Sequence, residues 1–203
     1  MNRGRLVAAA IVMGIGLPLV FVYARAMADG VRRAREAPLR AMFGDRIYER
    51  LLAGERTPMH YLGDDRLAPD FELRDRHGRP FRLSEQRGKT VVMNFWSITC
   101  PPCVEEMPTL VELADILAER DDVVLVAVST DAGWDEVAHL FPPDSRLRVI
   151  FDPDRAVTRG RYGTRLLPET WIVDREGVIR FRYDGARDWS SPLAIDVIDM
   201  FAR

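Results

Sequence analysis

The chain has few of the residues from which cysteine-based and metal-based sites are built. It contains two cysteines and three histidines in 203 residues. Two thiols cannot form a framework of several disulfides or a four-thiolate zinc site. His60, His77 and His139 stand far apart with no ligand spacing, so we expect no bound metal. The residue directly after Cys103 is not a histidine, which excludes the Cys-x-x-Cys-His motif for covalent haem attachment.

An excess of charge of one sign is also lacking. The formal net charge is −2, whereas nucleic-acid-binding proteins are usually basic. The chain has no internal repeat and no low-complexity run. We therefore expect a globular protein without a nucleic-acid partner.

A long uncharged run stands at the amino terminus. Leu6–Tyr23 follows Arg3 and Arg5, and as a helix it would span about 27 Å, close to the hydrocarbon thickness of a bilayer. We interpret residues 1–28 as a signal-anchor or a signal peptide, and hence predict an N-terminal transmembrane or signal helix. The run exceeds the roughly 7–15 residues of a signal core, which favours a retained anchor over cleavage and secretion.

The charges around this run point the other way. The arginines after it outnumber those before it, and by the positive-inside rule that would leave the rest of the chain in the cytoplasm. The first hydrophobic segment of a secreted chain normally directs the export of the domain behind it, so we expect an extracytoplasmic, periplasmic domain. Residues 29–66 are interpreted as a helical spacer or linker, with a helix over Val31–Leu52. A docking surface for a partner is the alternative for this region.

Residues 67–203 have the pattern of an α/β domain. Thr90–Trp96 is a mostly apolar run typical of a buried central strand, and an amphipathic helix follows it. Ser191 is expected to cap a last helix. Further strands and helices alternate along the chain, which predicts a central sheet covered on both faces. The remaining expected elements are hairpins over 71–83 and 170–183, strands over 123–128 and 147–151, a short helix over 134–141, and a helix or turn over 153–161.

The two cysteines lie where the central strand passes into the helix. Cys100 and Cys103 have the spacing of a redox pair, with Cys100 as the nucleophile and Cys103 as the resolving thiol. Pro101 and Pro102 supply no N–H, so the Cys103 amide is expected to donate to the Cys100 sulfur and lower the pKa of that thiol. A buried structural disulfide or half of a metal site is the structural alternative.

These features together resemble one family. The residues that carry the resemblance are Ala68–Leu73, Asn94–Trp96 before the Cys-Pro-Pro-Cys motif, Glu106, Pro108 and Leu110, and Leu167–Thr170. In this order and spacing they resemble the TlpA/ResA type of bacterial thiol–disulfide oxidoreductases. The resemblance covers the chain from about Ala68 onward and implies a thioredoxin-like fold with a mixed sheet. Two features depart from the thioredoxin pattern. Asn94 stands where thioredoxin has a buried aspartate, and the double proline leaves the redox potential open.

The resemblance also implies further site residues. Pro168 is expected to follow a cis peptide bond with Leu167 and to face the cysteines, so that the Leu167 backbone could bind an extended substrate. Trp96 is expected beside the active-site turn as a substrate-binding residue, or else as a core aromatic. Glu106 is a possible proton relay for Cys103, although a carboxylate early in a helix is favourable for electrostatic reasons alone.

We therefore expect an enzyme that exchanges disulfides with exported protein substrates. It would need no cofactor beyond its own redox-active disulfide, and the resemblance implies a reductive role with a membrane electron donor. Cytochrome c maturation and copper-site thiols are the client classes that it suggests. A thiol peroxidase is one alternative, although Met93 stands where that branch has proline. A non-enzymatic copper-delivery module is another, which the eight methionines suggest.

Overall fold

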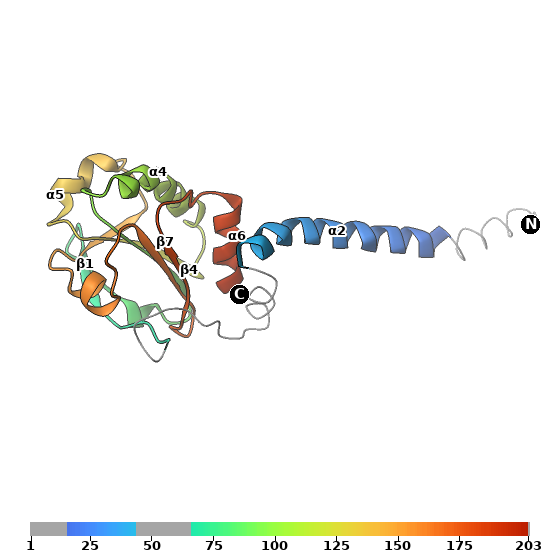
Figure 1. Ribbon diagram of the computed structural model, residues 1–203, viewed down its shortest axis with the longest axis horizontal. Helices are drawn as coiled ribbons and strands as arrows, with labels where there is room; N and C mark the ends of the chain where they lie inside the picture. The colour runs from blue at the N-terminus through green and yellow to red at the C-terminus, as the bar shows by residue number, and fades with distance from the viewer. Residues whose placement is uncertain (1–15, 44–65, 203) are drawn as a thin grey trace, which may run out of the picture. The chain divides into compact units, whose positions relative to one another are not determined.

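The computed structural model describes residues 16–43 and 66–202, and the chain divides into two units between Glu49 and Arg50 (Figure 1). The first unit contains helix α2, Leu17–Phe43, which is 27 residues long. It continues without a break across the predicted boundary between residues 28 and 29. The rest of the predicted spacer helix, residues 44–52, lies outside the described residues.

The predicted membrane span lies mostly outside the described residues as well. Leu19, Phe21 and Tyr23 belong to α2, and their side chains are 62–67% exposed. Over residues 16–43 and 66–202, no helix combines the length and the apolar character needed to cross a bilayer. Anchoring therefore stays a prediction.

The second unit is built on a seven-stranded mixed sheet in the order β2-β1-β5-β4-β3-β6-β7 (Figure 1). β3 lies parallel to β4, and β4 lies parallel to β5, whereas the other pairs are antiparallel. The strands are β1 Glu72–Asp75, β2 Pro80–Arg82, β3 Thr90–Trp96, β4 Val123–Ser129, β5 Arg148–Phe151, β6 Glu169–Val173 and β7 Ile179–Asp184. The hairpins and the central strand agree with the sequence-based expectations.

The helices follow the predicted order. Ser191 caps the last helix, because its Oγ accepts a hydrogen bond from the Ala194 N–H. The helical elements are η2 Leu83–Gln86, α4 Pro101–Ile116, α5 Trp134–Val137, η3 Ala138–Leu140, η4 Ala156–Arg161 and α6 Pro192–Phe201. The short helix expected over 134–141 is thus one α-helical turn followed by a 3-10 turn.

The segment over 153–161, expected as a helix or a turn, begins with a turn and continues as a helix. Only residues 156–161 are helical, and they form a single stretch of π-helix. Arg155 adopts a left-handed conformation with φ of 57°, which a regular helix starting at Pro153 could not contain. The buried Asp152 carboxylate accepts hydrogen bonds from the Val157 and Thr158 amides, which anchors the turn.

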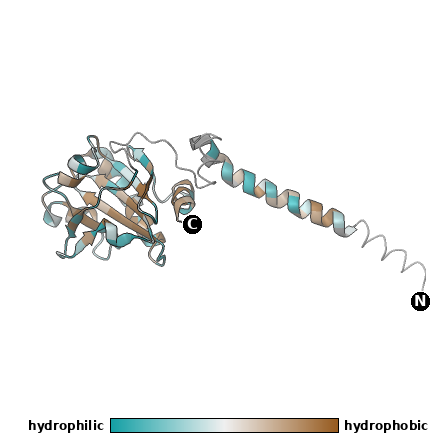
Figure 2. Ribbon diagram, turned by 90° about the horizontal axis from the view of Figure 1, so that it is seen from below, coloured by the Kyte–Doolittle hydropathy of each residue, from teal (hydrophilic) through white to brown (hydrophobic). Residues whose placement is uncertain are grey.

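The central strands carry the core. All seven residues of β3 are buried, and Val91, Met93 and Phe95 belong to a core cluster with apolar side chains of the neighbouring strands β4 and β6. Figure 2 shows the strands inside the domain coloured mainly as apolar. The register pairs Trp96 with Ser129 on β4 and Phe95 with Glu169 on β6. The carboxyl ends of β3 and β4 and the start of β6 therefore meet at one end of the sheet, where Cys100 follows β3.

Candidate active site

Cys100 and Cys103 form a disulfide at the start of α4, with their Cα atoms 5.3 Å apart. Cys100 is the residue that caps this helix, and its side chain is partly exposed. Cys103, one turn into the helix, has no exposed surface. The sulfur that an incoming thiol or disulfide can reach is therefore that of Cys100, which supports the predicted nucleophile and resolving roles.

The first turn of α4 offers the Cys100 sulfur a single hydrogen bond. The Cys103 N–H donates to Cys100 Sγ over 3.3 Å, and it also contacts the Cys100 carbonyl oxygen at 3.0 Å. Pro101 and Pro102 occupy the positions between the cysteines and have no N–H to add. The donor predicted from the sequence is thus confirmed. After reduction, this amide and the positive end of the helix dipole would both favour a thiolate at Cys100.

A buried aspartate braces the loop that carries Cys100, and it was not predicted from the sequence. Asp131 follows β4 and is 6% exposed. Its carboxylate accepts hydrogen bonds from Ser97 Oγ at 2.8 Å, the Ile98 amide at 2.9 Å and Ser129 Oγ at 2.8 Å. Ser97 Oγ in turn accepts from the Thr99 amide at 3.2 Å. The available signal was the polar Ser-Thr-Asp run at the carboxyl end of the strand beside β3.

Glu106 lies one turn beyond Cys103 and is 3% exposed. Its Oε1 accepts from Asn94 Nδ2 at 2.8 Å, and its Oε2 accepts from the Arg187 amide and the Trp189 indole N–H, each at 3.1 Å. Burial raises the pKa of the Glu106 carboxyl above its ordinary value, although these hydrogen bonds and the Arg187 charge act in the opposite direction. A carboxyl with this environment can exchange a proton at higher pH than a solvated glutamate.

Asn94 connects Glu106 to the strand that follows Pro168. Its Nδ2 donates to Glu106 and also to Thr170 Oγ1, at 3.0 Å. Thr170 is the register partner of Asn94 on β6. The departure from thioredoxin at position 94 is therefore matched by a carboxylate supplied from helix α4. The sequence pointed to Glu106 but not to its partners Arg187 and Trp189, which lie 81 and 83 residues away along the chain.

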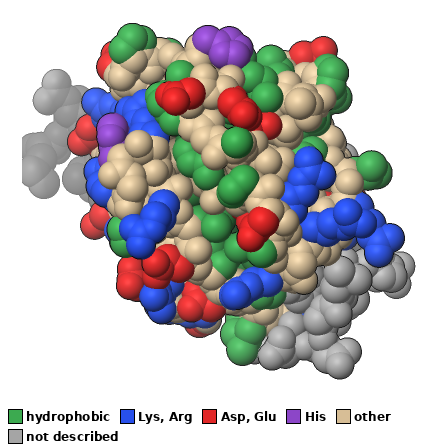
Figure 3. Space-filling view, turned by 90° about the vertical axis from the view of Figure 1, so that its left-hand side faces the viewer, with side chains coloured by type: hydrophobic (Ala, Val, Ile, Leu, Met, Phe, Trp, Pro, Cys, Tyr) green, Lys and Arg blue, Asp and Glu red, His purple; other side chains and the backbone are tan. Residues whose placement is uncertain are grey.

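The Leu167–Pro168 peptide bond is cis, as the sequence predicts. Pro168 is buried and immediately precedes Glu169, the partner of Phe95, so it stands beside the end of β3. Leu167 is half-buried, and Leu166 is 84% exposed. Figure 3 views the side on which α5 and β1 lie in Figure 1, and it shows apolar side chains gathered across the middle of that face.

Trp96 has no exposed surface. Its ring packs edge-on against Phe141 with centroids 5.9 Å apart, and Phe141 stacks on Trp134 at 5.3 Å. A side chain in this position cannot touch a substrate directly. The structure thus corrects the assignment of Trp96 as a substrate-binding residue and supports the alternative, a core aromatic beneath the active-site turn.

Among the described residues, no group of three or more cysteine, histidine, aspartate or glutamate side chains could hold a metal ion. His77 lies in the β1–β2 turn and His139 lies in η3, whereas His60 falls outside the described ranges.

Comparison with known proteins places similar sequences over the same region as the cysteine pair. A model of the AhpC/TSA family matches residues 65–182. The thiol-disulfide oxidoreductase ResA of Bacillus subtilis is 31% identical over 139 residues, which make up 67% of this chain and 73% of that protein. ResA of Geobacillus thermodenitrificans is 34% identical over 116 residues, or 56% of this chain, and the match spans 64% of that relative's length.

Solved structures share the same fold. A structure assigned as the thiol:disulfide interchange protein DsbE of Chlorobium tepidum matches with a TM-score of 0.58 and 25% identity, over 69% of this chain and 99% of that one. The exposed lipoprotein thioredoxin Etrx1 of Streptococcus pneumoniae matches with a TM-score of 0.55 and 25% identity, over 64% of this chain and 98% of that one. The second unit of the chain is therefore similar to thioredoxin-like domains over nearly their whole length.

Proposed function

The chain belongs to the AhpC/TSA family, and from that premise we propose that it is a thiol–disulfide oxidoreductase that acts through Cys100 and Cys103. One observation carries the proposal: the two cysteines form a disulfide whose first sulfur is accessible while the second is buried. A mixed-disulfide mechanism needs this asymmetry. The substrate disulfide must be able to contact the attacking sulfur, whereas the resolving sulfur reacts only afterwards, with the mixed disulfide.

The proposed reaction is the reduction of a disulfide in a protein substrate. The Cys100 thiolate attacks one sulfur of the client disulfide, the client S–S bond breaks, and the second client sulfur leaves as a thiolate. Cys103, once deprotonated, attacks the Cys100 sulfur of the mixed disulfide and displaces the remaining client thiolate. Two electrons pass to the client, and the protein is left with the Cys100–Cys103 disulfide.

Glu106 is the group that we assign to the Cys103 proton. It is buried one turn after Cys103, its pKa is raised by burial, and three donors hold its carboxylate in place. A carboxyl with a raised pKa can accept the thiol proton when Cys103 attacks and release it afterwards. Its role is proton transfer, whereas bond exchange belongs to the two sulfurs.

The substrate surface that we propose is the segment before β6. Leu166 is exposed and Leu167 is half-buried, so an extended client segment can contact both while its disulfide reaches Cys100.

We also propose that the domain works outside the cytoplasm, tethered by residues 1–28, and that a membrane electron donor returns it to the reduced state. The supporting observations are the uncharged run Leu6–Tyr23 and the similarity of the domain to the exposed lipoprotein thioredoxin Etrx1 of Streptococcus pneumoniae.

The first experiment measures disulfide exchange directly. Full-length protein should catalyse reduction of insulin disulfides by dithiothreitol, and Cys100→Ser should reduce the catalysed rate to background. Cys103→Ala should instead accumulate a mixed disulfide with the client, visible on non-reducing gels. Equal rates of insulin reduction for wild type and Cys100→Ser would refute the proposal.

Thiol peroxidase activity is the second candidate, since Ala68-Pro69-Asp70-Phe71 also resembles the opening of that branch. Peroxide consumption distinguishes the two reactions. An oxidoreductase should exchange insulin disulfides much faster than it consumes hydrogen peroxide, and the reverse ratio would favour the peroxidase. Copper titration of the reduced protein, with Cys100→Ser as the control, tests the copper-delivery alternative.

A further inference from the structure

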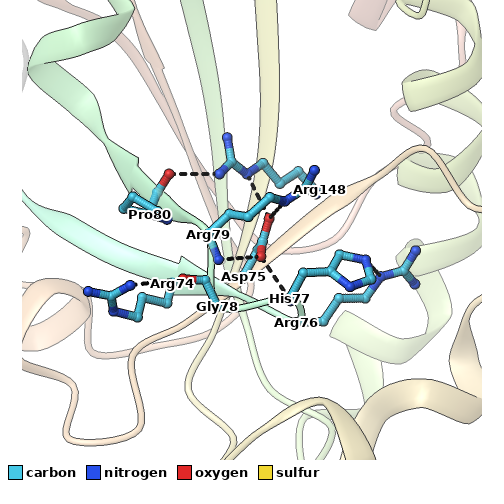
Figure 4. Close-up of polar contacts among 8 residues, drawn as sticks. All are labelled: Arg74, Asp75, Arg76, His77, Gly78, Arg79, Pro80 and Arg148. Carbon is cyan, nitrogen blue, oxygen red and sulfur yellow. Dashed lines mark hydrogen bonds and ion pairs between the residues drawn. The ribbon is translucent and has the colours of Figure 1, made fainter.

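A cavity of about 530 Å³ lies between the β1–β2 turn and the segment that leads into β5. Four arginines line it, namely Arg76, Arg79, Arg146 and Arg148, together with His77 and a single acid, Asp75. None of these residues belongs to the exchange site described above. Figure 4 shows Arg79 and Arg148 converging on Asp75 from two different elements.

Asp75 accounts for only part of this positive charge. Its Oδ1 accepts from the His77 and Arg79 amides at 2.9 and 3.0 Å, which closes the hairpin turn. Its Oδ2 lies 2.9 Å from Arg79 Nε and 3.5 Å from Arg148 Nε. One carboxylate thus holds two guanidinium groups in place, and among the residues that line the cavity four arginines stand against one aspartate, a surplus of positive charge in the lining.

The other two arginines are not drawn to the cavity by Asp75. Arg76 stacks on Trp134, with its Cζ 4.6 Å from the ring centroid, and donates to His77 Nε2. Arg146 is exposed and faces Asp115 and Glu119 at 3.9 and 3.6 Å, distances at which exposed ion pairs contribute little. Both side chains are therefore available to a ligand without loss of a strong interaction in the protein.

We propose that this cavity binds a phosphate monoester group. The N–H donors of a guanidinium group lie in one plane and can form two parallel hydrogen bonds to phosphate oxygens. Several guanidinium groups around one cavity therefore suit a small, multiply charged anion. A phosphate dianion offsets more of the surplus charge than one carboxylate can. The positive cavity also contrasts with the chain as a whole, whose formal net charge is −2. The phosphate could belong to a soluble ester or to a lipid headgroup, and the chemistry of recognition is the same.

Isothermal titration calorimetry on the full-length chain in nonionic detergent tests the proposal. Inorganic phosphate is the soluble probe, and detergent micelles that contain phosphatidic acid, compared with micelles that contain phosphatidylcholine, form the headgroup probe. The test variant is Arg76→Gln/Arg146→Gln, which keeps both arginines that pair with Asp75. Arg155→Gln/Arg159→Gln is the matched control, since it removes the same charge at two exposed positions outside the cavity.

We expect single-site binding that the test variant weakens by about tenfold or more and that the control variant leaves nearly unchanged. Arg146→Gln alone should give a smaller loss, which guards against misfolding of the double variant. Binding of phosphate alone assigns the site to soluble esters, and binding of phosphatidic acid alone assigns it to headgroups. Insulin reduction by the same variants should stay at the wild-type rate, so the result does not depend on the proposed redox activity.

Three outcomes would overturn the assignment. The first is no binding of either phosphate probe. The second is an equal loss of affinity in the control variant, which would indicate attraction to general surface charge. The third is binding of poly-glutamate without binding of phosphate, which would make the cavity a contact for acidic polypeptides instead.

Discussion

Trp189 Nε1 donates a hydrogen bond to Glu106 Oε2 over 3.1 Å and thereby joins the segment before α6 to the helix that carries the cysteines. The two residues are 83 positions apart, and Trp189 lies beyond the region that matches the family model, residues 65–182. Neither side chain has significant exposure. The environment of the proposed proton carrier is therefore completed by a part of the chain outside the matched region.

Replacing Glu106 with glutamine should slow disulfide exchange at neutral pH. The variant keeps the shape of the side chain but cannot accept the Cys103 proton, so we expect a loss on the order of 100-fold in the resolving step. Stopped-flow measurement of client release from the mixed disulfide checks this. Glu105→Gln is the matched control, because Glu105 is the exposed neighbour on the same helix, and its rate should equal that of wild type.

The same substitution should change how stability depends on pH. Burial raises the pKa of Glu106, so the folded protein binds this proton more tightly than the unfolded chain does. The stabilisation is complete below the ordinary carboxyl pKa and is lost as pH rises through the higher folded-state pKa. Urea unfolding at a series of pH values that starts below the ordinary carboxyl pKa and rises through neutrality should therefore show a shallower decline for Glu106→Gln. Some decline should remain, because burial also raises the pKa of Glu169. An unchanged slope would contradict the assignment.

Trp189→Phe should shift the pH profile of exchange without abolishing activity. The change removes one donor to the Glu106 carboxylate while it keeps an aromatic ring in the core, so the pKa of Glu106 should rise further. The lower limb of the pH–rate profile should move to higher pH. A uniform fall in rate with no movement of that limb would mean that Trp189 acts only through packing. Trp134→Phe, an indole that stacks on Phe141 instead, serves as the control.

Asp131→Asn should loosen the loop that presents Cys100. The asparagine amide cannot replace a carboxylate that accepts from Ser97, Ile98 and Ser129 at once. Loss of charge-assisted hydrogen bonds in a buried site should lower the free energy of unfolding by about 1.5–3 kcal/mol. Asp135→Asn, an exposed position in α5, should leave it unchanged. Chemical denaturation of both variants in the oxidised form makes the comparison.

Features set by neighbouring residues were predictable from the sequence. The buried run Thr90–Trp96 became the central strand with the expected bounds, Ser191 caps α6, and the Cys103 amide donates to the Cys100 sulfur. Each of these depends on a periodicity, a capping residue or the absence of a proline N–H over a few positions. Local features of this kind can be predicted from the sequence without knowledge of the fold.

Features that depend on long-range packing were not predictable in the same way. Asp131 reaches Ser97 only because β3 and β4 end side by side, and Trp189 reaches Glu106 only after α6 has packed on the domain. Trp96 shows the converse case, since its position next to the cysteines suggested contact with substrate. A strand residue points to one face of a sheet or to the other, and a covering aromatic such as Phe141 decides whether that face is open.

The first strand of the sheet order has a consequence for the proposed exchange with protein substrates. β2 is an edge strand among the described elements, is three residues long and begins with Pro80. Proline offers no N–H to a neighbouring chain, Arg82 places a charge on the same strand, and the Pro80 carbonyl already accepts from Arg148 at 2.9 Å. An unfolded polypeptide therefore finds little template for intermolecular β-pairing at this edge. A protein substrate of the proposed exchange reaction would therefore have little opportunity to pair with this edge of the sheet.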